Sequence, residues 1–392
     1  MSLQLVKDRV RFIEEALERY DVDAFLFLAR EVDNPQHMGY DLANTGWVGN
    51  TALLITKHGV RKAVARTYDS DNFPREVYEV EVYDVDLEEK LLQVLRDLNV
   101  RRVALNYAED EPLADTLGYG NYLKLERILR TLSNVEAVSG EEVMISAFGR
   151  RTSQELKLLK KAIASTERIM DDAYKKVLKP RKTEAAVAEF VRKEMGRHGF
   201  KAAWAPDICP IVSVGKNSLY GHHRPGNTKI SRGKIVHIDF GMFNGMCSDM
   251  QRIYYVLKRG ERSAPRKIEE MFEVQVASKA AAMKEMRPGA KGSDVDAAAR
   301  KVVKDAGFED FKHGTGHTLA RSTHAIGPGL FPLWPTYGKH GLYPLEANSV
   351  ITVEPSVRHE EIGIVSTEDD VLVGSDEATS LNAQQKHLLY IR

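Results

Sequence analysis

The chain has 392 residues, a length that favours two domains over a single hydrophobic core. Apolar residues make up 43% and charged residues 29%, which is the composition of a globular protein and excludes a disordered or fibrous chain. The 56 Lys and Arg residues balance the 56 Asp and Glu residues, so no net charge attracts nucleic acid or an anionic membrane. We therefore expect neither as a partner.

The N-terminal residues and the cysteines bear on the compartment. The first nine residues carry charge where a signal peptide needs an apolar run, and no run is long enough to span a bilayer. Cys209 and Cys247 are the only cysteines, and neither has a Cys-x-x-Cys partner, which argues against a disulfide scaffold and a thiolate metal site. These features predict a cytoplasmic protein.

The first 150 residues alternate between helical and strand-like patterns. Apolar positions at helical spacing predict a helix over residues 3–20. We predict strands over 24–28, 52–56, 62–65 and 103–106, and further helices over 87–98 and 122–132. The pattern predicts an α/β domain over residues 1–150, without clustered His, Asp and Glu residues at ligand-like spacing.

A second domain is predicted over residues 151–392. Two long amphipathic helical patterns, at about 154–178 and 264–286, are each followed by a turn, a second helix and strand-like residues. Two such units predict a pseudo-twofold α+β domain, in which helices back a curved antiparallel sheet.

A hairpin around residues 236–249 carries two of the candidate metal ligands. Strand-like residues flank Phe243-Asn244-Gly245, which suits a three-residue loop with Gly245 in the left-handed conformation. If Met242 pairs with Met246, Asp239 lies opposite Asp249, with Cβ atoms about 5 Å apart. Two carboxylates at that separation repel each other, and a cation between them would remove the conflict.

Three further segments contain residues that can bind metal. His313, His317 and His324 lie close together, and the glycines between the first two favour a loop over a helical metal-binding pair. Glu354 ends an apolar run, and Glu368 interrupts another; a buried acid is costly unless it is paired or bound to metal. With the two aspartates, these residues form a mixed oxygen and nitrogen set that suits Mn, Co, Fe or Zn.

The order of these motifs resembles the pita-bread metallopeptidases, which include Xaa-Pro dipeptidase (prolidase), Xaa-Pro aminopeptidase and methionine aminopeptidase. The two-domain length is similar to prolidase, the Xaa-Pro aminopeptidases and creatinase. The resemblance spans essentially the whole chain, and the ordered Asp, Asp, His, Glu, Glu set is specific to this family. It implies a small peptide as substrate, a homodimer, and two divalent ions per chain, with Mn or Co favoured over Zn or Fe.

The resemblance also implies a role for each candidate residue. Asp239, Asp249 and Glu368 would hold one ion, while Asp249, His317, Glu354 and Glu368 would hold the other, so that Asp249 and Glu368 bridge the two. Glu354 would also carry the proton from water to the leaving nitrogen. His222 and His324 would act on the substrate as catalytic hydrogen-bond donors, and His313 falls where related enzymes carry another substrate-side histidine.

Several positions depart from the family pattern. Asp239 and Asp249 are one residue closer together than is usual. Gln251 stands where a threonine is usual and Arg358 where a tyrosine is frequent; Ala320 and Ala325 also differ from the pattern. Ser366 replaces an arginine that commonly precedes the last metal-binding glutamate.

The departures bear on the substrate, because serine lacks the charge and planar fork of arginine. We therefore expect weak cleavage of Xaa-Pro dipeptides, with longer peptides cut at least as well. Candidate pocket walls are Trp204, Phe331, Trp334 and Tyr337. Two alternatives stay open, a creatinase-like C–N hydrolase without metal and a catalytically silent binding module of the same fold.

Overall fold

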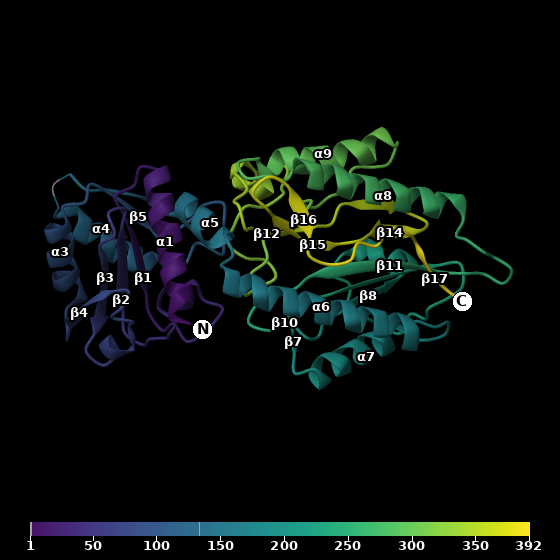
Figure 1. The fold of residues 1–392 in the computed structure, drawn as a ribbon, viewed down its shortest axis with the longest axis horizontal. Helices are drawn as coiled ribbons and strands as arrows, with labels where there is room; N and C mark the ends of the chain where they lie inside the picture. Colours follow the sequence, from purple (N-terminus) through teal and green to yellow (C-terminus); the bar gives the residue numbers. More distant parts are fainter. Residues whose placement is uncertain (1, 133) are drawn as a thin grey trace. The chain divides into compact units, whose positions relative to one another are not determined.

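The computed structural model describes residues 2–132 and 134–392, and the chain divides into two compact units, Met1–Thr152 and Ser153–Arg392. Within the described residues, no helix combines the length and the apolar character needed to cross a membrane. Figure 1 shows the helices and strands of each unit along the chain.

The first unit is an α/β layer built on one six-stranded sheet of order β4-β3-β2-β1-β5-β6. The β1–β2 and β2–β3 pairs are antiparallel, and the β3–β4, β1–β5 and β5–β6 pairs are parallel, so the sheet is mixed. Its elements are α1 (Leu3–Arg19), β1 (Ala24–Ala29), α2 (Met38–Ala43), β2 (Thr51–Thr56), β3 (Arg61–Arg66), β4 (Glu79–Tyr83), α3 (Leu87–Leu98), β5 (Arg102–Leu105), α4 (Tyr119–Arg130), β6 (Glu136–Ser139) and α5 (Glu141–Gly149). The predicted α/β class is confirmed.

The sheet of the first unit carries helices on its faces. Alternate residues of β1, such as Leu26 and Leu28, pack with Leu91 of α3 and Leu125 of α4 in one apolar cluster. Alternation of side chains across a strand explains why β1, whose residues are all buried, needs a covering layer on both faces.

The second unit repeats a pattern of two helices followed by strands (Figure 1). The first copy contains α6 (Ser153–Lys176), α7 (Glu184–Arg197), β7 (Lys201–Ala202), β8 (Ile211–Val214), the 3₁₀ turn η2 (Gly215–Tyr220), β9 (Ile235–Phe240), β10 (Met242–Phe243) and β11 (Met250–Val256). The second contains α8 (Arg266–Glu285), α9 (Gly292–Asp305), β12 (Val350–Val353), β13 (Ser356–His359), β14 (Gly363–Ser366), β15 (Asp369–Val373), β16 (Ala378–Ser380) and β17 (Leu389–Ile391). Strand pairing is antiparallel except between β11 and β17. The predicted helix-backed domain is confirmed.

Strands β12 to β15 have a core face and an acid-bearing face. Val353, Val357 and Val365 belong to the apolar cluster that contains Met271 and Phe272 of α8. Lys279, also on α8, donates a hydrogen bond of 2.7 Å from Nζ to Oγ1 of Thr367. On these strands the odd-numbered side chains therefore face α8, and the even-numbered ones face the other way.

Candidate metal centre

The β9–β11 hairpin positions the two aspartates. Its register pairs Asp239 with Gln251 and Phe240 with Met250, and Phe243 forms a bridge with Cys247. The loop is thus Asn244–Met246, one residue later than predicted, and the predicted pairing of Asp239 with Asp249 is wrong by two residues. Gly245 has φ +81°, as expected for a left-handed loop position. Because a shift of two residues preserves alternation, Asp239 and Asp249 still approach each other, and their carboxyl groups are in hydrogen-bond contact.

His317 lies on a segment that runs beside β12. Thr352 N donates to the His317 carbonyl (2.9 Å), and Glu354 N donates to the carbonyl of Thr315 (2.8 Å). A Cβ at Gly316 would lie 1.7 Å from the carbonyl oxygen of Thr352, so only glycine permits this approach. The predicted non-helical conformation of this segment is confirmed, and it brings His317 next to Glu354.

The five predicted ligands meet from four segments of the second unit. The His317 Nε2 atom lies 3.8 Å from Asp249 Oδ2, 3.6 Å from Glu354 Oε1 and 4.0 Å from Glu368 Oε1. Ligand atoms of Asp249, His317 and Glu368 all lie within 4.8 Å of one another, close enough to hold one metal ion. Asp239 extends the group through its contact with Asp249.

Burial makes ionisation of this cluster costly. It raises the pKa of Asp239 to about 7. Burial, followed by the charge of Asp239, raises the pKa of Glu354 to about 8. The pKa values of Asp249 and Glu368 are also raised well above their usual range, first by burial and then by the neighbouring carboxylates. Burial and then His324 lower the pKa of His317 to about 3, so the imidazole is neutral and able to bind a metal.

Unsatisfied carboxylate oxygens test whether a cation fits. Asp239 Oδ1, Asp249 Oδ1 and both carboxylate oxygens of Glu368 are buried without a hydrogen-bond partner. Buried polar atoms are normally bonded, and several unbonded carboxylate oxygens around one neutral imidazole are the donor set of a divalent cation. The residues present therefore fit a metal centre.

Gln251 links Glu354 of the cluster to His237 of β9. Its Nε2 donates to Glu354 Oε2 (3.0 Å), and its Oε1 lies 3.1 Å from Nε2 of His237. Burial lowers the pKa of His237 to about 4, so the imidazole is neutral and its Nε2 is the donor to Gln251. From the sequence, Gln251 was identified only as a departure from the family pattern, and its contact with Glu354 was not predicted.

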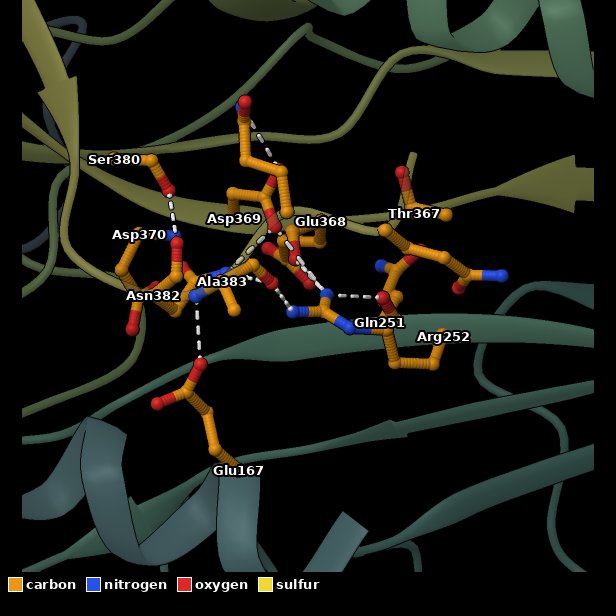
Figure 2. Close-up of polar contacts among 12 residues, drawn as sticks. Glu167, Gln251, Arg252, Thr367, Glu368, Asp369, Asp370, Ser380, Asn382 and Ala383 are labelled. Atoms are coloured by element: carbon orange, nitrogen blue, oxygen red, sulfur yellow. Dashed lines mark hydrogen bonds and ion pairs between the residues drawn. The ribbon is translucent and has the colours of Figure 1, made fainter. Parts of the chain in front are cut away.

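A buried ionic group fixes the segment that carries Glu368 (Figure 2). Asp369 forms ion pairs with Arg252 (3.3 Å) and with Lys279, and Asn382 Nδ2 donates to it (2.7 Å). The Arg252 guanidinium also donates to the Glu368 carbonyl (2.9 Å). The charges of Asp369 are thus satisfied internally, whereas the carboxylate of Glu368 is left for a ligand.

Asp370 is a further buried acid, and it was not among the predicted site residues. The Oδ2 atom of Asp370 accepts a hydrogen bond of 3.3 Å from the Asp249 backbone nitrogen. The backbone nitrogen of Asp370 donates to Asn382 Oδ1. The run Glu368-Asp369-Asp370 inside a strand-like pattern was the available signal, since three adjacent acids in an apolar run need partners.

The three other predicted histidines lie in different surroundings. The ring of His324 lies 4.2 Å, between centroids, from that of His317. Partial burial and then the charge of His222 lower the pKa of His324, and both residues keep solvent-accessible surface. His313 has both ring nitrogens engaged, Nδ1 with the Gly314 carbonyl (2.7 Å) and Nε2 with Ser356 Oγ (2.8 Å).

Glu184 anchors the loop that carries His222. This fully buried carboxylate accepts hydrogen bonds from Val214 N (2.8 Å), Asn217 Nδ2 (2.8 Å) and Gly226 N (3.1 Å). Its Oε2 also lies 3.0 Å from Nε2 of His223. One side chain therefore connects both ends of the segment around His222, a role that no local sequence pattern indicated.

Three of the four aromatic candidates for pocket walls form one group. Phe331 stacks on Tyr337 with ring centroids 4.5 Å apart, and Trp334 stacks on Tyr337 at 6.1 Å. The Tyr337 hydroxyl accepts a hydrogen bond from Gly314 N (3.2 Å), which places the group beside the His313 loop. Trp204 instead packs against the apolar core under α7.

The sequence model of metallopeptidase family M24 matches residues 157–375, which is more than half of the chain. This chain belongs to metallopeptidase family M24. The family is metal-dependent, and the buried group of Asp249, His317 and Glu368 could bind a metal ion. The predicted resemblance to the pita-bread peptidases is confirmed.

Curated M24 relatives are similar over part or all of their length. The chain is 27% identical to an Xaa-Pro dipeptidase of Pyrococcus furiosus over 241 residues, covering 61% of this chain and 64% of that protein. It is 22% identical to an Xaa-Pro dipeptidase of Pyrococcus horikoshii over 391 residues, covering 99% of this chain and 100% of that protein.

Solved structures of two dipeptidases are similar to this chain over nearly its whole length. A dipeptidase PepE from Mycobacterium ulcerans has a TM-score of 0.77 and 23% identity, with 100% of this chain and 99% of that chain covered. An Xaa-Pro dipeptidase from Bacillus anthracis has a TM-score of 0.73 and 21% identity, with 98% and 100% covered. At identities of 21% and 23%, this structural similarity establishes the shared fold alone.

Proposed function

We propose that this M24 chain is a dinuclear metallopeptidase that cleaves Xaa-Pro bonds in short peptides. The observation that carries the proposal is the convergence of three carboxylates on one neutral imidazole, with Asp239 joined through Asp249 and four carboxylate oxygens buried and unbonded. The names of the Pyrococcus relatives support the proline specificity. When bound, the ions supply Lewis acidity, which activates the attacking water and polarises the scissile carbonyl.

The chain's own residues have distinct proposed roles. Asp239, Asp249, His317, Glu354 and Glu368 hold the ions. Glu354 also moves the proton from water to the leaving nitrogen, and a pKa raised by burial suits a group that must take up and release a proton. His222 and His324 have solvent-accessible surface, and His324 lies beside His317; both are assigned as hydrogen-bond donors to the substrate and to the tetrahedral intermediate.

Substrate recognition is proposed to involve the aromatic residues beside the His313 loop. The aromatic group of Phe331, Trp334 and Tyr337 offers flat apolar surfaces for a proline ring. His313 is less suited to direct contact than predicted, because Ser356 and Gly314 already engage its two nitrogens. We propose that His313 shapes the pocket through its hydrogen bond with Ser356. Its Nε2 could bond to the substrate only if the Ser356 side chain rotated away.

A panel of substrates tests the proposal. The protein is chelated, reloaded with Mn or Co, and incubated with Ala-Pro, Ala-Pro-Ala, Ala-Ala-Ala and creatine. We expect release of alanine from the two proline peptides and no hydrolysis of creatine. Hydrolysis of creatine without metal would support the C–N hydrolase, and a metal-loaded protein that cleaves none of the four would support the silent binding module. The homodimer is a separate prediction, which light scattering would test.

A further inference from the structure

Arg358 lies on the same face of the β13–β14 hairpin as the metal-binding glutamates. Ser356 pairs with Ser366, and Arg358 pairs with Ile364, one same-face step further from the metal centre. Val357 and Val365 pack toward α8 on the opposite face. The face that bears Arg358 therefore continues the one on which Glu354 and Glu368 lie. Arg358 is the only cation among its six even-numbered residues, which are Glu354, Ser356, Arg358, Ile364, Ser366 and Glu368.

Two contacts place this end of the hairpin beside the predicted substrate residues. Ser356, two residues before Arg358, contacts Nε2 of His313 through its Oγ (2.8 Å). Ile364, which pairs with Arg358, donates from its backbone nitrogen to Ser218 Oγ (2.7 Å). Ser218 belongs to η2, which leads directly into His222. The Arg358 end thus lies between the His313 segment and the His222 loop.

The Arg358 guanidinium has no partner among the residues that the structure describes. Its residue is half-buried, and across residues 2–132 and 134–392 no hydrogen bond or ion pair joins it to another group. The usual partner of a guanidinium in such a place is a carboxylate or phosphate, which it binds through two parallel N–H donors. The neighbouring Lys216 differs, because it is exposed and already paired with Glu361 (2.8 Å).

We propose that Arg358 binds the free C-terminal carboxylate of the peptide substrate. The inference rests on the proposed peptidase function, because a carboxylate is the anion that every unblocked short peptide carries. It adds a specificity residue on the side of the leaving group, where Ser366 brings no charge.

Peptides with a free or an amidated C-terminus test the anchor. For the metal-loaded wild type, we expect KM for Ala-Pro-Ala to be about tenfold or more below that for Ala-Pro-Ala-amide, as for a hydrogen bond to a charged group. In Arg358→Met the KM for the acid should rise to that of the amide, with kcat nearly unchanged. Arg358→Lys should retain part of the preference, since it keeps the charge without the planar fork. Lys216→Met is the matched control, and it should keep the full preference.

Calorimetric titration of the same acid and amide into the chelated protein gives a readout that does not need turnover. Tighter binding of the acid that disappears in Arg358→Met supports the anchor even if the protein hydrolyses nothing, an outcome that would refute only the peptidase function. Equal binding and equal KM for acid and amide in the wild type, or an unchanged preference in Arg358→Met, would overturn the anchor while leaving the peptidase function in place.

Discussion

Gln251 donates a hydrogen bond of 3.0 Å from its Nε2 to Oε2 of Glu354, while its Oε1 faces Nε2 of His237. The bond fixes one oxygen of Glu354 and leaves the other, Oε1, 3.6 Å from the His317 imidazole. Residues that orient metal ligands typically contribute a factor of 10–100 in metal affinity or activity. Gln251 therefore has a positioning role toward Glu354.

We predict that Gln251→Ala lowers metal affinity about 10–100-fold, because Glu354 loses the donor that holds it. Competition against a fluorescent chelator measures the affinity. Gln385→Ala is the matched control: Gln385 is equally buried and bonds to Ile253 of the same strand, but it does not touch a predicted ligand. The control should lose thermal stability and keep its metal. Equal metal affinity in wild type and Gln251→Ala would refute the positioning role.

Replacement of the substrate-side histidines should separate catalysis from metal binding. His222→Ala and His324→Ala should each lower kcat about 10²–10³-fold, as expected for loss of a donor to the transition state, while the metal content stays at the wild-type level. Mass spectrometry of the metals in each purified variant provides the comparison. Loss of metal from either variant would show that its histidine is a ligand.

Glu184 should act on turnover through His222. Glu184→Gln keeps the size of the side chain but weakens its bonds to Gly226 N and His223, so the loop around His222 should shift and kcat should fall. If the effect passes through His222, the substitution should cost little more in a chain that already carries His222→Ala. The control is Glu194→Gln, on the same helix but paired with Arg197 outside this loop. Additive losses in the double variant would show a general structural effect instead.

The metal-free protein should become less stable as the pH rises from about 6.5 to 8. Burial raises the pKa of Asp239 to about 7 and that of Glu354 to about 8. Between the ordinary pKa of these acids, about 4, and the raised values, the folded chain binds more protons than the unfolded chain, so its free energy of unfolding falls with pH. His317, with its pKa lowered to about 3, stays neutral in this window.

Thermal melts of the chelated protein across that pH range check the prediction. Added Mn or Co should reverse the trend, raising Tm most at the higher pH, because the ions bind the ionised carboxylates. A Tm for the chelated protein that rises between pH 6.5 and 8 would contradict the account of a cluster that ionises at a cost.

The sequence predicted the fold class because its local patterns agree with the final packing. The helix predicted over residues 3–20 is observed as Leu3–Arg19, and that over 87–98 as Leu87–Leu98. The elements it missed have weak local signals. Strand β4, for example, has a single buried residue, Tyr83, so no apolar alternation marks it. Helix α5 is buried on all sides and shows little amphipathic pattern.

The site was less predictable, since its precision depends on contacts between distant segments. The hairpin register was wrong by two residues because a three-residue loop can be formed by either Phe243–Gly245 or Asn244–Met246, and Gly245 is compatible with both. The prediction that Asp239 and Asp249 lie on the same face was still correct, because side chains alternate with period two and the register error was two residues. The contacts of Gln251 with Glu354 and of Glu184 with Gly226 join residues 103 and 42 positions apart, beyond the reach of any local pattern.

The most direct test of the central claim is the metal content of the chain. We predict about two Mn or Co ions per chain after chelation, reconstitution and removal of free metal, measured by mass spectrometry. Asp249→Asn, which removes an anionic oxygen from the centre, should lose both metal and turnover while its circular dichroism stays native. Asp370→Asn should keep the metal, because its amide oxygen can still accept from Asp249 N. A wild-type chain that retains no divalent ion under any of these conditions would contradict the account.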